Sequence, residues 1–304
     1  MIFCGKAKPL ISCSTTQTSK QKPIYVISDL HIGNGSAKDN LIKNDRGRTL
    51  MRFLDHVQHS DGKLVICGDL FELWRYPLED ILDAWKPLID RLAEMDVSYI
   101  PGNHDPLLDN RYAAVRQWHP LFRKLSAPFL QTLGGKRFKF MHGHEIDPVV
   151  ADAMVRLAPV FRLFTGALEF RRDCCLVTSD RVTDILLEAG EQILRLWHTL
   201  TRRVNQAIDE SLFPLSGEGL IRLKQPIRMR NMMWRFYRQQ EEGLYDITIT
   251  GHTHYAGRFG RWYYNCGCWT RPTAGFLRID PDGEACVCDW TEQGERINNT
   301  VLTI

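Results

Sequence analysis

The sequence contains no apolar run of the roughly 18 residues that a membrane span needs. It also contains no internal repeat and no low-complexity segment. The net charge of +3 is too small to indicate nucleic-acid binding by itself, so any basic surface must be local. No acidic residue occurs in residues 1–22, and no long apolar stretch precedes Cys13 as a signal peptide requires. We therefore expect residues 1–22 to form a flexible leader.

The composition is that of a globular protein. The chain has 304 residues, of which 44% are hydrophobic and 25% charged, enough for one large domain or two. Its nine cysteines are odd in number and lie mostly in apolar, strand-like runs, unlike the disulfide framework of a secreted protein. This usage indicates a reducing compartment, and we predict a cytoplasmic location.

Five short apolar runs end on polar side chains of the kinds that bind metals. They are "IYVISDLHIG", "KLVICGDL", "VSYIPGNHD", "RFKFMHGHE" and "YDITITGHTH". Helical spacing of apolar residues in 49–59 and 77–95 separates the first three runs. Alternating strands and helices predict a layered α/β fold, in which sites gather at the carboxyl ends of the strands. The polar residues at these ends are Asp29, His31, Asp69, Asn103, His142, His252 and His254.

Each of these residues has an ordinary structural alternative. Asp29 fits a helix cap, Asp69 a turn, Asn103 a left-handed turn, and His142 a hydrogen-bonded core position. Five strand ends with only Asp, His and Asn at the ligand positions favour a shared metal site. Mixed nitrogen and oxygen ligands suit Mn, Fe or Zn, whereas Mg and Ca prefer oxygen alone.

The blocks "SDLHIG", "GDLFELW", "GNHD", "HGHE" and "GHTH", in this order, resemble those of the calcineurin-like metallophosphoesterases. The resemblance covers about residues 24–269, apart from roughly 145–245. It implies a four-layer α/β/β/α sandwich that holds two divalent metal ions, for which we expect manganese, with iron or zinc as alternatives. One ion would bind Asp29, His31, Asp69 and His254, and the other Asp69, Asn103, His142 and His252, so that Asp69 bridges them.

The resemblance also implies hydrolysis of a phosphorus ester or anhydride. Two metal ions suit this chemistry because they activate water and bind phosphate oxygens. His104 would stabilise the transition state or protonate the leaving oxygen, and Asp105 would orient it. The alternative for His104 is a spacer that never touches the substrate.

Within the family, the first two blocks look most like the UDP-2,3-diacylglucosamine pyrophosphatases of lipid A synthesis. That group usually has G-N-R-D where this chain has "GNHD", and H-G-D where it has "HGH". We predict a pyrophosphate or phosphodiester hydrolase, with a nucleotide-sugar lipid as the best candidate substrate. The alternatives are a nuclease, or another phosphodiesterase or phosphatase of the superfamily, or an inactive scaffold. Stacking aromatics interleaved with lysine are sparse, which argues against nucleic acid, and no ligand is missing.

A helical cap insertion is predicted at about 148–242, within a single phosphoesterase domain at 23–304. Its end, 220–239, contains six basic residues and no acidic one. On a helix, Arg228, Arg230 and Arg235 would flank an apolar face of Met229, Met232, Met233 and Phe236. Such a helix could rest on an anionic surface at the inner membrane face, or bind a phosphate-rich substrate. Alternatively, it packs its methionines into the core. The oligomeric state is left open.

The sequence pattern of residues 261–290 predicts three short strands that complete the second sheet. These residues also contain two C-x-C pairs, Cys266 with Cys268 and Cys286 with Cys288. Four cysteines raise the question of a zinc site, but structural zinc more often uses C-x2-C, and strand period puts each pair on one face. We interpret them as free thiols.

Overall fold

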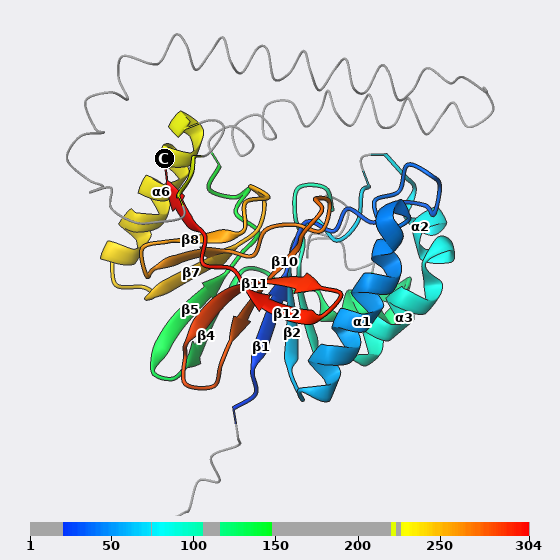
Figure 1. Ribbon diagram of the computed structural model, residues 1–304, viewed down its shortest axis with the longest axis horizontal. Helices are drawn as coiled ribbons and strands as arrows, with labels where there is room; N and C mark the ends of the chain where they lie inside the picture. The colour runs from blue at the N-terminus through cyan, green and yellow to red at the C-terminus, as the bar shows by residue number, and fades with distance from the viewer. Residues whose placement is uncertain (1–20, 74, 106–115, 148–219, 223–225, 304) are drawn as a thin grey trace, which may run out of the picture.

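Two β-sheets stacked face to face form the centre of the protein (Figure 1). The computed structural model describes residues 21–73, 75–105, 116–147, 220–222 and 226–303. The first sheet has the order β12-β11-β10-β1-β2-β3 and the second β4-β5-β7-β9-β8-β13-β6. The first comprises β1 Ile24–Ile27, β2 Lys63–Cys67, β3 Val97–Ile100, β10 Ala274–Ile279, β11 Ala285–Thr291 and β12 Gly294–Ile297. The second comprises β4 Phe129–Leu133, β5 Lys136–Phe140, β6 Leu220–Arg222, β7 Ile247–Thr250, β8 Gly257–Phe259, β9 Tyr263–Asn265 and β13 Val301–Thr303.

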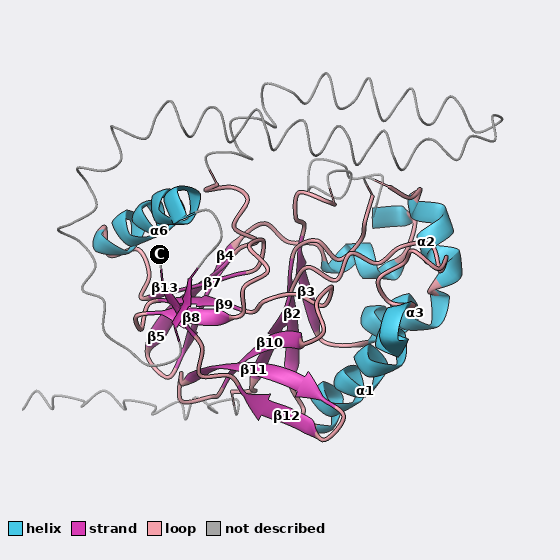
Figure 2. Cartoon of the chain, turned by 45° about the horizontal axis from the view of Figure 1, so that its top comes forward, coloured by secondary structure: helices cyan, strands magenta, loops and turns pink. Residues whose placement is uncertain are grey.

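Helices cover the outer face of each sheet (Figures 1 and 2). The helices α1 Arg46–His59, α2 Leu78–Ala84 and α3 Lys86–Glu94 lie on the first sheet, whereas α6 Pro226–Glu241 lies on the second. Two short 3-10 helices, η1 Lys43–Asp45 and η4 Pro120–Lys124, complete the assignment. In the described part of the chain, no helix combines the length and the apolar character needed to cross a membrane.

The alternation of side chains along β1 shows how the layers are built. Ile24 and Val26 are buried between the two sheets, whereas Tyr25 and Ile27 face the helices of the first layer. Successive strand residues point to opposite faces, so a strand that is apolar at every position is buried on both. A third apolar cluster lies between the second sheet and α6. Three such clusters separate four layers, and the predicted α/β/β/α sandwich is confirmed.

The helix predicted at 49–59 is α1, and its apolar face is buried as the spacing indicates. Leu50, Phe53, Leu54 and Val57 are all completely buried. The stretch predicted as one helix at 77–95 is instead two, α2 and α3. The break falls just before Pro87, which has no N–H to donate to the preceding turn.

The predicted destination of the last strands is wrong for two of the three. The strand β9 does lie in the second sheet, but β10 and β11 belong to the first, where β10 pairs antiparallel with β1. Both faces of β10 are buried, with Phe276 toward the helices and Leu277 between the sheets. An apolar strand of this kind belongs at a central position of a sheet, and alternation alone does not say which sheet.

Two predicted segments lie largely outside the described residues: the leader at 1–22, of which 1–20 are not described, and the cap at 148–242 as far as residue 219. The described end of the cap is part of the sandwich. The strand β6 pairs with β13, and α6 buries Met232, Met233 and Phe236 against Met141 and Tyr263. The apolar face of α6 is therefore used inside the protein, which favours core packing over contact with a membrane.

Candidate metal centre

The predicted ligands follow strands that end at a common edge of the sandwich. In the first sheet β1, β2 and β3 run parallel, so that Asp29, Asp69 and Asn103 follow neighbouring strands in the same direction. In the second sheet β5 and β7 are parallel, which places His142 beside His252. The ring centroids of these two histidines are 5.1 Å apart. Parallel strands thus gather side chains that are far apart in the sequence.

The backbone at the candidate ligands is unusual. Positive φ angles of 48° to 65° occur at five of them, a conformation that residues other than glycine rarely adopt. Such strain concentrates at functional sites, where surrounding bonds hold it in place. The amide N–H of His252 donates to Asp29 Oδ2 at 2.8 Å, and that of His31 to the Asp69 carbonyl at 3.0 Å. The five residues are Asp29, His31, Asp69, His252 and His254.

Glycine permits the loops to approach this closely. A Cβ on Gly68 would overlap with the His142 ring, and a Cβ on Gly102 would overlap with the Asp69 carboxylate. Both glycines directly precede candidate ligands, so the "GD" and "GN" pairs have a steric cause.

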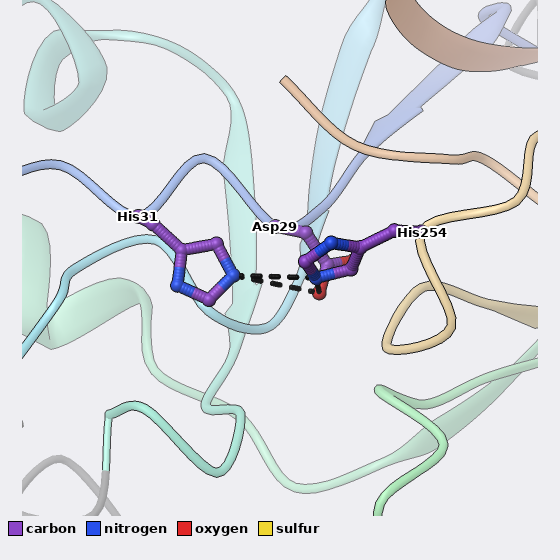
Figure 3. Close-up of side chains that lie close together, drawn as sticks. All are labelled: Asp29, His31 and His254. Atoms are coloured by element: carbon purple, nitrogen blue, oxygen red, sulfur yellow. Dashed lines mark hydrogen bonds and ion pairs between the residues drawn. The ribbon is translucent and has the colours of Figure 1, made fainter. Parts of the chain in front are cut away.

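The first group of ligand atoms comes from Asp29, His31 and His254 (Figure 3). The Nε2 atoms of the two histidines are 3.4 Å apart, and Asp29 Oδ1 lies 3.0 Å from that of His254 and 3.9 Å from that of His31. Bonds of about 2.0–2.2 Å to one transition metal ion place neighbouring ligands at such separations. Asp29 Oδ1 is buried and accepts no hydrogen bond from the described residues, as expected of an atom that binds a cation. The residues present fit a metal ion.

The second group centres on Asp69. His142 Nε2 lies 3.2 Å from Asp69 Oδ2 and 3.1 Å from Asn103 Oδ1, and all three residues are buried. The same Asp69 oxygen is 3.8 Å from His31 Nε2 in the first group. One carboxylate thus reaches both groups, as the predicted bridging role requires. The structure brings all seven predicted ligands together.

Three of the candidate histidine ligands have an oxygen atom beside their other ring nitrogen, and this contact orients the ring. His31 Nδ1 lies 3.0 Å from Glu72 Oε2, and His252 Nε2 lies 2.8 Å from Asp147 Oδ2, which leaves Nδ1 as the ligand atom of His252. His142 Nδ1 is 2.7 Å from the carbonyl oxygen of Cys67. Carboxylates and carbonyls in this position fix the ring and its tautomer. Neither Glu72 nor Asp147 is among the predicted site residues: Glu72 lies within the block "GDLFELW", and Asp147 lies two residues after the block "HGHE".

His104 lies beside the first group, where Glu72 also contacts it. Its Nδ1 is 2.9 Å from Glu72 Oε1, and its ring centroid is 4.5 Å from that of His31. Its side chain is 25% exposed, so it is open to a substrate from solvent. The single carboxylate of Glu72 therefore aligns a metal ligand and the predicted acid.

The predicted role of Asp105 in orienting His104 is wrong. The buried carboxylate of Asp105 accepts hydrogen bonds from the amide N–H groups of Leu70, Phe71 and Gly102, at 2.9–3.1 Å. The Asp105 carboxylate thus joins the loop after β2 to the loop after β3. The contact with His104 that was expected of Asp105 is made by Glu72. Burial, followed by repulsion from Asp69, raises the pKa of Asp105 to about 7.

The buried carboxylates of the site favour positively charged neighbours, as the pKa values of the surrounding groups show. Burial lowers the pKa of His142 and His254, but Asp69 and Asp29 outweigh this and raise the two pKa values to about 10 and about 11. Burial likewise opposes ionisation of Glu72, but its bonds to His104 and His31 lower its pKa to about 2. Buried carboxylates of this kind need cations, either protons on histidine or metal ions.

His144 is a further polar residue at the edge of the second group. Its ring centroid lies 5.3 Å from that of His142 and 6.4 Å from that of His252. Its nearest charged neighbour is Glu145, at 3.6 Å. Burial lowers the pKa of His144 to about 4, so its imidazole is neutral at pH 7.

The cysteine pairs do not form a metal site in the described part of the chain. Cys266, Cys268, Cys286 and Cys288 are all free thiols, and no metal-type group there includes a cysteine. Cys266 donates to the Thr250 carbonyl at 3.2 Å, and Cys268 donates to the backbone carbonyl of His254 at 3.9 Å. The interpretation as free thiols stays a prediction.

The predicted substrate-binding arginines are not brought to the metal ligands by any described contact. Arg235 Nη1 donates to the Ile146 carbonyl at 3.1 Å, which ties α6 to the loop that contains His142 and Asp147. The side chains of Arg228 and Arg230 lie outside the described part of the structure.

Comparison with known proteins gives one strong match. The family model of the calcineurin-like phosphoesterases matches residues 22–256, a range that contains every candidate ligand. No curated protein matches the chain. A solved structure, a protein of unknown function from Aquifex aeolicus, is 16% identical, with 51% of this chain and 75% of that chain covered and a TM-score of 0.26.

Proposed function

The chain belongs to the calcineurin-like phosphoesterase family, and from this premise we propose that it hydrolyses a pyrophosphate or phosphodiester bond. The protein is a metal-dependent phosphoesterase, and its substrate contains phosphate. The observation that carries the proposal is the position of Asp69, whose carboxylate lies between two groups of histidine and carboxylate ligands. Two metal ions held there supply Lewis-acid activation of the phosphoryl group and of the attacking water.

His104 handles the proton in this proposal. Its Nδ1 lies 2.9 Å from Glu72 Oε1, and we assign the proton transfer to the other ring nitrogen, Nε2. Burial opposes a charge on His104, but Asp69 and Glu72 raise its pKa above the usual value. In this proposal the imidazole, protonated on Nε2, donates that proton to the leaving oxygen, and the raised pKa favours the protonated form.

The finer proposal for the substrate is a nucleotide-sugar lipid of the UDP-2,3-diacylglucosamine type, hydrolysed at the cytoplasmic face of the membrane. Its support is the likeness of the first two motif blocks, and the His104 and His144 substitutions are departures from that group. Manganese is the metal that we propose, and iron and zinc also fit the mixed ligand set.

The test is product analysis by mass spectrometry. The manganese-loaded protein is incubated separately with UDP-diacylglucosamine, dinucleotides and single-stranded DNA, with an Asp69→Asn variant as the control for contaminating activity. Release of UMP and a lipid phosphate supports the finer proposal, and shortened DNA favours a nuclease. Fully metal-loaded protein that hydrolyses none of these substrates contradicts the proposed function.

A further inference from the structure

A cavity of about 110 Å³ lies beside the metal centre, on the side of His254. Three loops enclose it: the loop after β7, the loop between β9 and β10, and the loop before β13. The candidate ligand His254 lines the cavity, so the cavity and the first metal group share a residue. The other lining residues used below are Tyr255, Cys268, Arg271, Thr273 and Thr300.

The size of the cavity restricts what it holds. A dry cavity of about 150 Å³ accommodates benzene, so the smaller volume here takes a group of about five heavy atoms. A phosphate group has this size. A nucleobase or an acyl chain is too large.

The charge of the cavity favours an anion. The Arg271 guanidinium lies 4.5 Å from the centroid of the Tyr255 ring, and none of the described carboxylates pairs with it. Asp289, which pairs with the lining residue Gly275 across β10 and β11, is already bonded to Arg296 at 2.9 Å and to Asn298 at 3.2 Å. Stacking on an aromatic ring holds the planar guanidinium in place while its N–H groups stay available at the edge.

Two threonines are among the lining residues and add hydroxyl groups to this part of the protein. Thr273 and Thr300 line the same cavity, and a hydroxyl donates to a phosphate oxygen as readily as it accepts. A guanidinium with neighbouring hydroxyls recognises phosphate, because charge-assisted hydrogen bonds from the guanidinium to phosphate oxygens are short and strong.

We propose that this cavity, the Arg271 cavity, binds a second phosphate group of the substrate, next to the phosphate held at the metal centre. The proposal rests on the proposed function and narrows it. In a pyrophosphate, the two phosphate groups are adjacent because they share one bridging oxygen. The metal centre and the Arg271 cavity are likewise adjacent, because His254 belongs to both. The site therefore selects pyrophosphate substrates over monoesters and over diesters with a single phosphate.

The test measures binding, so that it does not depend on turnover. Methylenediphosphonate, which has two phosphorus groups and resists hydrolysis, and methylphosphonate, which has one, are titrated calorimetrically into the manganese-loaded protein. We expect Arg271→Gln to weaken methylenediphosphonate binding about tenfold and to leave methylphosphonate binding unchanged, because only one charge-assisted contact is lost. Elemental analysis after desalting shows that each variant retains its metal.

Arg261→Gln is the matched control, because Arg261 is an exposed arginine in the turn between β8 and β9 and does not line the cavity. It should bind both ligands like wild type. The proposal is overturned if wild type binds the two ligands equally well, if Arg271→Gln has no effect, or if that variant loses both ligands equally.

Failure of the proposed function gives a different result. Protein that prefers methylenediphosphonate in an Arg271-dependent way, but hydrolyses no pyrophosphate or diester, supports the cavity and contradicts the function. Protein that hydrolyses a pyrophosphate with unchanged KM in Arg271→Gln supports the function and overturns the cavity.

Discussion

Asp69 is the residue on which both candidate metal positions depend. We expect Asp69→Asn to reduce hydrolysis of a small chromogenic phosphodiester to background, because its carboxylate reaches ligands of both groups. The fold should survive, as judged by circular dichroism. Asp289→Asn is the control, since Asp289 is also a buried carboxylate of the first sheet, and its side-chain partners among the described residues are Arg296 and Asn298. Near wild-type turnover with two bound metals in Asp69→Asn would show that the assignment is wrong.

His104 separates proton transfer from metal binding. His104→Ala should retain both metals and lower kcat by roughly 10²- to 10⁴-fold, the usual contribution of a positioned acid. A substrate whose leaving group needs no protonation, such as a nitrophenolate ester, should be affected least. Loss of metal in elemental analysis would instead identify His104 as a ligand.

Asp147 acts on metal affinity through His252. Asp147→Asn should weaken metal binding roughly 10- to 100-fold, as is typical when a partner of a ligand is changed. At saturating metal the rate should recover, whereas the rate of His104→Ala should not. Competition with a fluorescent chelator measures the affinity, and an unchanged affinity would contradict the orienting role.

His142 and His254 make metal binding dependent on pH. Their pKa values of about 10 and about 11 in the metal-free fold lie above the usual value of 6.5, so both rings are protonated at pH 7. In the metal-free protein these groups contribute stability that is complete below about pH 6.5 and lost as pH rises through 10 to 11. A metal ion needs the neutral ring, so loading should release close to two protons at pH 7 and strengthen as pH rises. Calorimetry in buffers of different ionisation enthalpy counts these protons, and a value of zero would show that both rings are already neutral at pH 7 in the metal-free fold.

Much of the metal site can be predicted from sequence, because an apolar run followed by Asp, Asn or His marks a strand and its carboxyl end at once. Glu72 and Asp147 could not be found in this way. They do not follow a strand directly, and their role depends on contacts with the far side of a histidine ring. Asp105 was misassigned for the same reason, since its neighbour in sequence is not its neighbour in space.

Among the elements, α6 shows what periodicity can decide and what it cannot. The spacing of Met232, Met233 and Phe236 predicts an apolar face, but whether a core or a membrane covers it is a tertiary question. The same holds for β10 and β11, whose alternation gives the faces of a strand and not its partners. The break at Pro87 was readable from the sequence, because a proline in the interior of a helical pattern ends or bends the helix.

Phe236 tests the packing of α6. It is completely buried, and its ring centroid lies 5.3 Å from that of Tyr263 in the second sheet. Phe236→Ala should lower the free energy of unfolding by about 3–5 kcal/mol, measured by urea titration of the metal-loaded protein. Leu244→Ala, at a side chain that is 55% exposed, should change it by less than about 0.5 kcal/mol. Equal effects of the two changes would indicate that α6 is not docked on the sheet.

For the whole molecule, the ligands connect the two sheets. Asp29, His31 and Asp69 follow strands of the first sheet, whereas His142, His252 and His254 follow strands of the second. Bound metal ions would therefore hold the two halves of the sandwich together and stabilise the folded state by mass action.

The pairing of β1 with β10 has a consequence for how the protein is made. Ile24 pairs with Ile279 in the antiparallel ladder, so β1 gains this partner only after β10 has been synthesised. At roughly 5–20 residues per second, β1 waits on the order of ten seconds or more for its partner. During that time one edge of the apolar strand β1 has no partner. We therefore expect a chaperone to bind the nascent chain. His252 and His254 follow β7, so both candidate metal groups are complete only after that strand has been synthesised, and metal binding cannot guide the folding of the strands made before it.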